Sequence, residues 1–175
     1  MQEIADKAEI NKSMLHYYFR TKEKLFYNIF EMVLNDFFPI ISDIVSSNAK
    51  LEDKIRQICK SYISILQKNP YMPLFIISEI SRNPEKLKCF VQDNLRERFE
   101  LIKEVFFKQI KEEKLRQIDA THIIMNIISL SVFHFAAMPL FKALFEFNDN
   151  EYAELLEERK EIVGDTITSW LKNMG

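Results

Sequence analysis

The segment 11–26 places side chains that donate and accept hydrogen bonds on one face of a short helix. At helical spacing, that face carries Lys12, Ser13, His16, Tyr17 and Arg20. Two cations, a hydroxyl, an imidazole and a phenol on a rigid support are groups that contact base edges and phosphates in a DNA major groove. Spacing alone equally allows an ordinary amphipathic helix with a solvated polar face.

The other face of this helix must hold it in place. Its apolar side chains recur at spacings of three and four, at Leu15, Tyr18 and Phe19. They can dock on a preceding short helix, which offers Ile4, Ala5 and Ala8. Two short helices joined by a tight turn, with the second exposed, form a helix-turn-helix. We expect Asn11 to cap the second helix and Thr21 to cap a third.

The charge around this segment is local. The whole chain has a net charge of −2, so any nucleic-acid site must be a patch. Residues 12–24 supply that patch, since they hold four cations and one anion. Lys22 lies just inside the third helix, where its ammonium and the free N–H groups of the helix end can hold a DNA phosphate.

The rest of the chain predicts an all-α fold. Apolar residues follow a helical period throughout, and 2 glycines among 175 residues argue against a fold of tight hairpins. We expect eight helices, with Pro39 kinking or ending the third and one long helix over 85–114. A helix-turn-helix unit with the start of a connecting helix should occupy residues 1–45, and a larger helical unit residues 46–175.

An uncharged run of 22 residues, Ala120–Phe141, is long enough to cross a bilayer. It contains His122, Asn126, His134 and Pro139, and no Lys/Arg cluster flanks it. A helix buried within the protein or in a dimer interface accounts for it better than a membrane span. Because the N-terminus has no apolar signal core, we expect a cytoplasmic protein without a membrane partner.

No arrangement of residues predicts catalysis. The three histidines pair with no Cys, Ser or carboxylate at a recognisable spacing, and no Gly-rich phosphate loop is present. Cys59 and Cys89 match no metal or redox spacing. We therefore expect no enzyme, no cofactor and no metal site.

The stretch IADKAEINKSMLHYYFRTKEKLF resembles the helix-turn-helix of the TetR family of bacterial transcriptional repressors. The matching residues are Ile4, Ala5, Ala8, Ile10, Asn11, Lys12, Leu15, Tyr17, Tyr18, Phe19, Thr21, Lys22, Glu23 and Leu25. The resemblance implies that Lys12, Ser13, His16 and Tyr17 lie in the major groove. It also implies that Lys22 contacts phosphate, and that Tyr18 and Phe19 hold the helix while the Tyr18 hydroxyl reaches the DNA backbone.

Three departures from the family pattern matter. Glu9 stands where the family usually has Gly, so the turn should be strained or altered, with a negative charge near DNA. His16 stands where Tyr is commoner. The family also has a further helix before Ile4, roughly 20–30 residues with its turn. We expect residues 1–175 on their own to bind DNA weakly through a frayed N-terminal unit.

The resemblance further implies that the larger unit binds a small ligand and forms a homodimer. A pocket for an apolar or aromatic ligand is predicted from Tyr62, Met72, Phe75, Phe99, Phe106, Met125, Phe133 and His134. Packed core is the alternative for each, and His134 needs a hydrogen-bond partner, either a ligand or a backbone carbonyl. A dimer interface is predicted from Ile124, Ile128, Leu155, Ile162, Val163, Ile167 and Trp170, and the alternative is that the two helices that carry them complete the core of a monomer.

The predicted function is a ligand-responsive repressor that binds double-stranded operator DNA as a homodimer. The alternative is a helical ligand-binding or interaction protein that does not bind DNA in this form.

Overall fold

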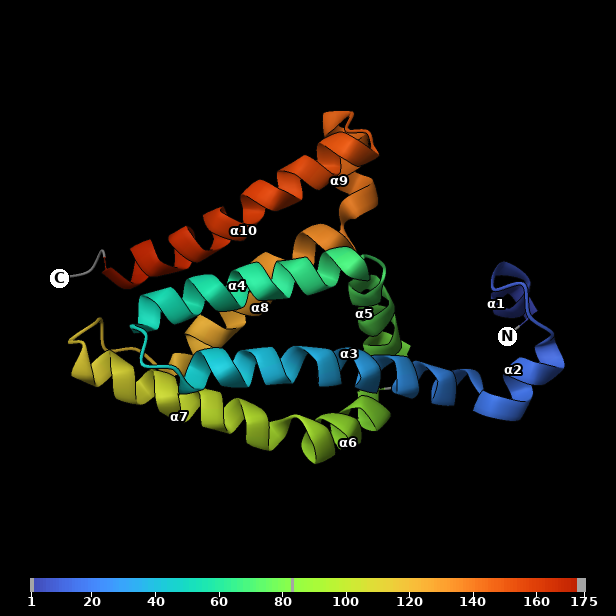
Figure 1. The fold of residues 1–175 in the computed structure, drawn as a ribbon, viewed down its shortest axis with the longest axis horizontal. Helices are drawn as coiled ribbons and strands as arrows, with labels where there is room; N and C mark the ends of the chain where they lie inside the picture. The colour runs from blue at the N-terminus through green and yellow to red at the C-terminus, as the bar shows by residue number, and fades with distance from the viewer. Residues whose placement is uncertain (1, 83, 173–175) are drawn as a thin grey trace. The chain divides into compact units, whose positions relative to one another are not determined.

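The computed structural model describes the backbone of residues 2–82 and 84–172, which form helices and no strand (Figure 1). The all-α prediction is confirmed for this part of the chain. Its helices are α1 (Gln2–Lys7), α2 (Lys12–Phe19), α3 (Lys22–Ser46), α4 (Leu51–Lys68), α5 (Met72–Arg82), α6 (Pro84–Asn94), α7 (Arg96–Glu112), α8 (Ala120–Ala136), α9 (Met138–Phe145) and α10 (Asp149–Lys172).

The chain divides into two compact units, Met1–Ile40 and Ile41–Gly175. The first contains α1, α2 and most of α3, and the second contains the end of α3 and the helices from α4 onward. Helix α3 does not end at Pro39, as the sequence had allowed, but continues to Ser46. Proline removes one backbone hydrogen bond yet permits helical φ, so a helix can resume after it.

Two long helices were expected where the structure has four. Leu95 separates α6 from α7, and the Asn94 side chain donates to the Phe90 carbonyl at 2.9 Å, in competition with the backbone ladder. Ala137 separates α8 from α9, since Pro139 lies in the first turn of α9 and has no N–H for the Phe135 carbonyl. The prediction of eight helices was therefore wrong.

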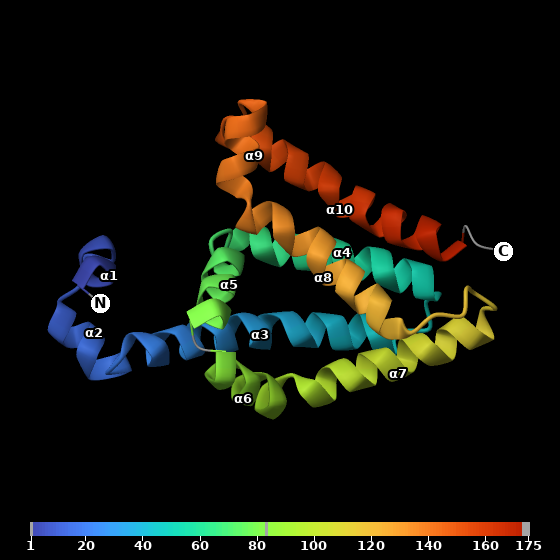
Figure 2. The same ribbon diagram turned by 180° about the vertical axis from the view of Figure 1, so that it is seen from behind.

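The core of the second unit is built on α4 and α10, which run antiparallel along each other, with α8 beside α4 (Figure 2). Their facing side chains are buried: Leu51, Ile55, Cys59, Ile63, Val163, Ile167 and Leu171. Ion pairs follow the same contact on its outer side, with Arg56–Asp165 at 2.7 Å and Lys60–Glu161 at 2.8 Å. Val163 and Ile167, predicted for a dimer interface, are each 1% exposed within this core, so the structure does not bring them to the surface.

Two polar contacts, one buried and one partly buried, hold the C-terminal end of α3 and its neighbours in the second unit. The Lys54 ammonium donates to the Val45 carbonyl at 2.7 Å, and Glu113 accepts from the Leu51 N–H at 2.9 Å. Burial lowers the pKa of Lys54, and the charge of Glu113 opposes that shift. These contacts attach the last turn of α3 to the start of α4 and the end of α7.

Within the described residues, no helix by itself has the length and hydropathy that a membrane crossing needs. Only α8 and α9 together reach it, across a 65° bend.

Gly164 sets how closely α10 approaches α4. A Cβ atom at this position would lie 3.1 Å from the Arg56 Cα and Cγ atoms. We predict that Gly164→Val lowers the free energy of unfolding by about 1–3 kcal/mol, because the added side chain must push the helices apart. The exposed Ala153→Val on the same helix is the matched control, and urea unfolding should show at most about 0.7 kcal/mol for it. Equal losses in the two variants would contradict a close helix crossing.

Candidate nucleic-acid interface and ligand cavity

Helix α2 rests on a small apolar cluster made by the three helices of the first unit. Ala5 of α1, Leu15 of α2 and Leu25 of α3 are buried in it. Partly buried side chains surround these three, namely Ile4, Phe19 and Ile29. The predicted docking of α2 on α1 is therefore present.

The turn between α1 and α2 has the hydrogen-bond pattern of a Schellman motif. The Ile10 N–H donates to the Ala5 carbonyl at 3.0 Å, and the Glu9 N–H donates to the Asp6 carbonyl at 3.3 Å. This pattern requires a left-handed residue at the position of Glu9, whose φ is 54°. The strain expected from a Glu in place of Gly is thus observed.

Side-chain caps fix where the next two helices begin. Asn11 accepts from the Ser13 N–H at 2.8 Å, and Thr21 accepts from the Lys24 N–H at 3.2 Å. Both predicted N-caps are confirmed. Asn11 thus fixes the start of α2, Thr21 fixes the start of the helix that follows it, and the apolar cluster packs against the inner face of α2. The outer face of α2 therefore lies on a fixed support.

All six residues predicted to bind DNA are exposed: Lys12, Ser13, His16, Tyr17, Tyr18 and Lys22. Tyr18 was expected to help hold the helix, but its side chain is 65% exposed and its ring meets the ring of Tyr17 edge-on at 5.3 Å. Only Phe19 of that pair packs on the cluster, because it lies nearer to Leu15 around the helix axis.

The polar groups of this face keep free hydrogen-bonding capacity. Within the described residues, Lys12, Arg20 and Lys22 have no ion pair. The His16 Nδ1 atom lies 3.1 Å from the Arg20 carbonyl, so a neutral ring donates there and presents Nε2 as an acceptor. The face therefore offers cations, a hydroxyl, an imidazole acceptor and phenols to a partner.

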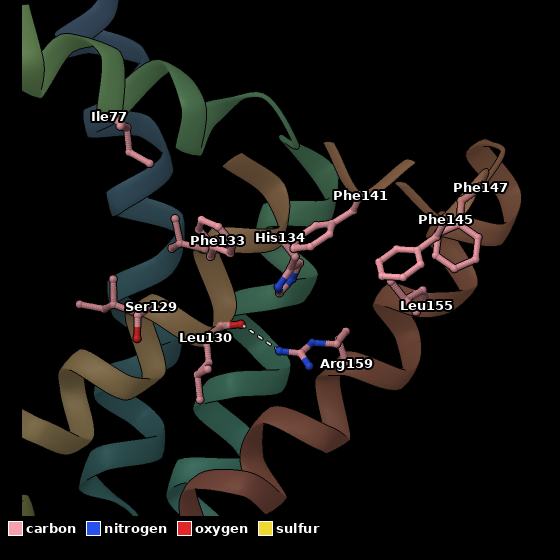
Figure 3. Close-up of a pocket in the computed structure, with 12 residues that line it drawn as sticks. Ile77, Ser129, Leu130, Phe133, His134, Phe141, Phe145, Phe147, Leu155 and Arg159 are labelled. Atoms are coloured by element: carbon pink, nitrogen blue, oxygen red, sulfur yellow. Dashed lines mark hydrogen bonds between the residues drawn. The ribbon is translucent and has the colours of Figure 1, made fainter. Parts of the chain in front are cut away.

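A cavity of about 870 Å³ lies in the second unit, open between α8, α9 and α10 (Figure 3). Its described lining residues are Ile77, Ile128, Ser129, Leu130, Val132, Phe133, His134, Phe141, Phe145, Phe147, Leu155 and Arg159. Aromatic rings form a row along it, with centroids 5.9 Å apart for Phe133–Phe141 and 6.3 Å for Phe141–Phe145. A volume of this size is within the range of small-molecule sites.

Two ionisable side chains lie among these apolar residues. His134 is 6% exposed, and burial lowers its pKa to about 4, with the charge of Arg159 adding to the shift. A hydrogen bond to the Leu130 carbonyl opposes that shift. Arg159 donates to the same carbonyl at 3.5 Å, a distance at the limit of a hydrogen bond. At neutral pH the site therefore contains an uncharged imidazole next to a guanidinium.

The structure brings only part of the predicted pocket together. Phe133 and His134 line the cavity, whereas Tyr62, Met72, Phe75, Phe99, Phe106 and Met125 are not among its described lining residues. Phe106 is fully buried and Met125 is 59% exposed. Ile128 and Leu155, which are predicted for the dimer interface, also line the cavity.

Sequence reasoning missed several lining residues: Phe141, Phe145, Phe147 and Arg159. Their signal was present in the sequence. Phe141 and Phe145 are four residues apart, and Arg159 interrupts the apolar face that includes Leu155 and Ile162. Of the other predicted interface residues, Ile162 is 45% exposed, while Ile124 and Trp170 are half-buried.

A helix-turn-helix with an exposed second helix, followed by a helical unit with an apolar cavity, defines a DNA-binding regulator. The family model described as "Bacterial regulatory proteins, tetR family" matches residues 1–29. The model described as "Tetracyclin repressor-like, C-terminal domain" matches residues 52–167, which is more than half of the chain. The chain therefore belongs to the TetR family of transcriptional regulators. No curated protein matches it.

Glu9 is the residue of the turn whose backbone conformation is unfavourable for an amino acid with a side chain. Because a side chain in the left-handed region costs about 1–2 kcal/mol, we predict that Glu9→Gly stabilises the first unit by about 1 kcal/mol. Slower hydrogen exchange at the amides of α1 and α2 would report the gain. Glu9→Gln removes the charge and keeps the strained backbone, so it should leave exchange unchanged. An equal effect of both variants would assign the destabilisation to charge.

Proposed function

We propose that the protein is a ligand-responsive repressor that binds operator DNA as a homodimer. The observation that carries this proposal is the outer face of α2, whose polar and cationic groups are exposed while Leu15 is buried beneath them. A face of this composition is suited to a polyanion with hydrogen-bonding edges.

On DNA, Lys12, Ser13, His16 and Tyr17 contact base edges in the major groove, since they share the outer face of α2. Tyr18 and Lys22 lie toward the end of α2 and the start of α3, where they contact phosphates. The N–H groups of the first turn of α3 strengthen the site for a phosphate at Lys22.

The homodimer is supported by apolar side chains that this chain leaves exposed on α8 and α10. Those with the largest exposure are Met125 at 59%, Ile128 at 38%, Phe133 at 61% and Ile162 at 45%. Exposed apolar groups that are clustered on neighbouring helices favour association. A two-fold dimer reads two half-sites about one DNA turn apart.

Ligand response is supported by the cavity, which lies between α8, α9 and α10 of the second unit. A ligand shifts the population of a protein toward the state that it binds better. A ligand that favours a state with a different placement of α3 changes the spacing of the two recognition helices and releases DNA.

Selection of binding sites from a random duplex pool by the full-length protein tests this function. We expect an enriched sequence with two-fold symmetry. Lys22→Ala should weaken binding to all sequences and lower the slope of log affinity against log salt by about one. Lys60→Ala is the matched control, because Lys60 is an exposed cation of the second unit, paired with Glu161. No enrichment, or equal effects of the two substitutions, would contradict DNA recognition by this face.

A further inference from the structure

The cavity contains two buried polar atoms that have no hydrogen-bond partner within the described residues. They are the Nε2 atom of His134 and the Nε atom of Arg159. Buried polar atoms in proteins nearly always have partners, so two such atoms on residues that line one cavity favour a polar ligand group there. Two other atoms of this kind, Gln109 Oε1 and Ser131 Oγ, belong to residues outside the described lining. The two side chains enter the cavity from α8 and α10 and converge near the Leu130 carbonyl (Figure 3).

Arg159 also has an unpaired charge. Two acidic residues near it on α10 pair with other cations, Glu157 with Lys160 and Glu161 with Lys60. The adjacent Glu158 is exposed to solvent. Within the described residues, Arg159 has no ion pair. A guanidinium in an apolar cavity attracts an anion more strongly than it would in water, because little solvent screens it.

His134 sets a second requirement on the polar group of the ligand. Its hydrogen bond to the Leu130 carbonyl and its low pKa leave Nε2 of the neutral ring as an acceptor. A carboxylic acid satisfies both residues. At neutral pH the free ligand is a carboxylate, so it binds together with one proton taken up from solvent. One oxygen then accepts from Arg159, and the proton lies between the other oxygen and Nε2. The net charge is the same whichever of the two atoms holds that proton.

The other residues that line the cavity are apolar, so the part of the ligand beyond its polar group should be apolar too. Phe141, Phe145, Phe147 and Leu155 supply aromatic and aliphatic surface around the two polar atoms. The ring centroids of Phe145 and Phe147 lie 5.7 Å apart. The cavity wall therefore offers aromatic rings and aliphatic groups for contact with an apolar ligand.

We propose that this cavity binds a monocarboxylic acid with an apolar body, its carboxyl group held between Arg159 and His134. The inference rests on the proposed function, in which the second unit is the ligand-responsive part. It goes further because it assigns the chemical class of the ligand and the two residues that recognise it.

Two matched ligand series test the proposal with the full-length protein. One has an aromatic body (naphthoic acid, naphthamide, methylnaphthalene) and the other an alkyl body (decanoic acid, decanamide, decanol). Within at least one series, calorimetry at neutral pH should show the acid binding about tenfold tighter than its amide. The carboxylate neutralises the charge of Arg159, whereas the amide makes the same hydrogen bonds but leaves that charge unpaired. The series that binds better identifies the body.

Variants locate the carboxyl group. Arg159→Met keeps an unbranched side chain and removes the charge, so the preference for the acid should disappear while the apolar members still bind. Lys60→Met removes an exposed cation elsewhere in the same unit and should keep the preference. An acid preference that survives Arg159→Met, or none in the unmodified protein, would overturn the proposal.

Two parallel measurements separate this proposal from the proposed function. If the unmodified protein selects a symmetric operator but binds no acid preferentially, the regulator stands and the carboxylate assignment fails. If the acid binds as predicted but operator affinity is unchanged, the ligand class stands and the release mechanism fails. Sedimentation tests another occupant. If the unmodified protein shows no acid preference and Arg159→Met self-associates more weakly than it does, a second copy of the chain fills the cavity.

Discussion

The packing of Leu15 with Ala5 and Leu25 is the contact on which the placement of the exposed face of α2 depends. Helix α1 has 6 residues and α2 has 8, lengths at which an isolated helix is not stable in water. Their order must therefore come from burial of apolar side chains against each other and against α3. Removing a buried leucine typically costs about 2–5 kcal/mol, which is large for a unit with so few buried residues.

The second unit is stabilised in a different way from the first. Its stability lies in the long antiparallel contact of α4 with α10, where Gly164 permits close approach and ion pairs cover the outer edge. Because that contact supplies most of the packing, α8 and α9 can expose aromatic side chains. His134 of α8 and Arg159 of α10 each keep one unsatisfied polar atom. Exposed apolar surface and unsatisfied polar groups are unfavourable for folding, so their presence around the cavity supports the proposal that a partner binds there.

The helix caps and the turn could be predicted from the sequence, because they depend only on residues that are close in the chain. Asn11 and Thr21 cap as expected because capping depends on a residue type and its next few neighbours, and Glu9 has a positive φ because the turn requires one. The cavity could be predicted only in part, because its lining depends on how α8, α9 and α10 pack on one another and on α5, which is distant in sequence. Tyr18 and Val163 show the same limit: a helical pattern gives the face of a residue, but whether that face is covered depends on the tertiary neighbours.

Operator affinity of Leu15→Ala tests the role of the apolar cluster most directly, since Leu15 is 4% exposed and cannot contact DNA. If the cluster alone holds the α2 face in its binding geometry, the variant should lose sequence-specific binding while the thermal unfolding of the second unit is unchanged. Binding at the unmodified affinity would contradict the claim that DNA recognition depends on this packing.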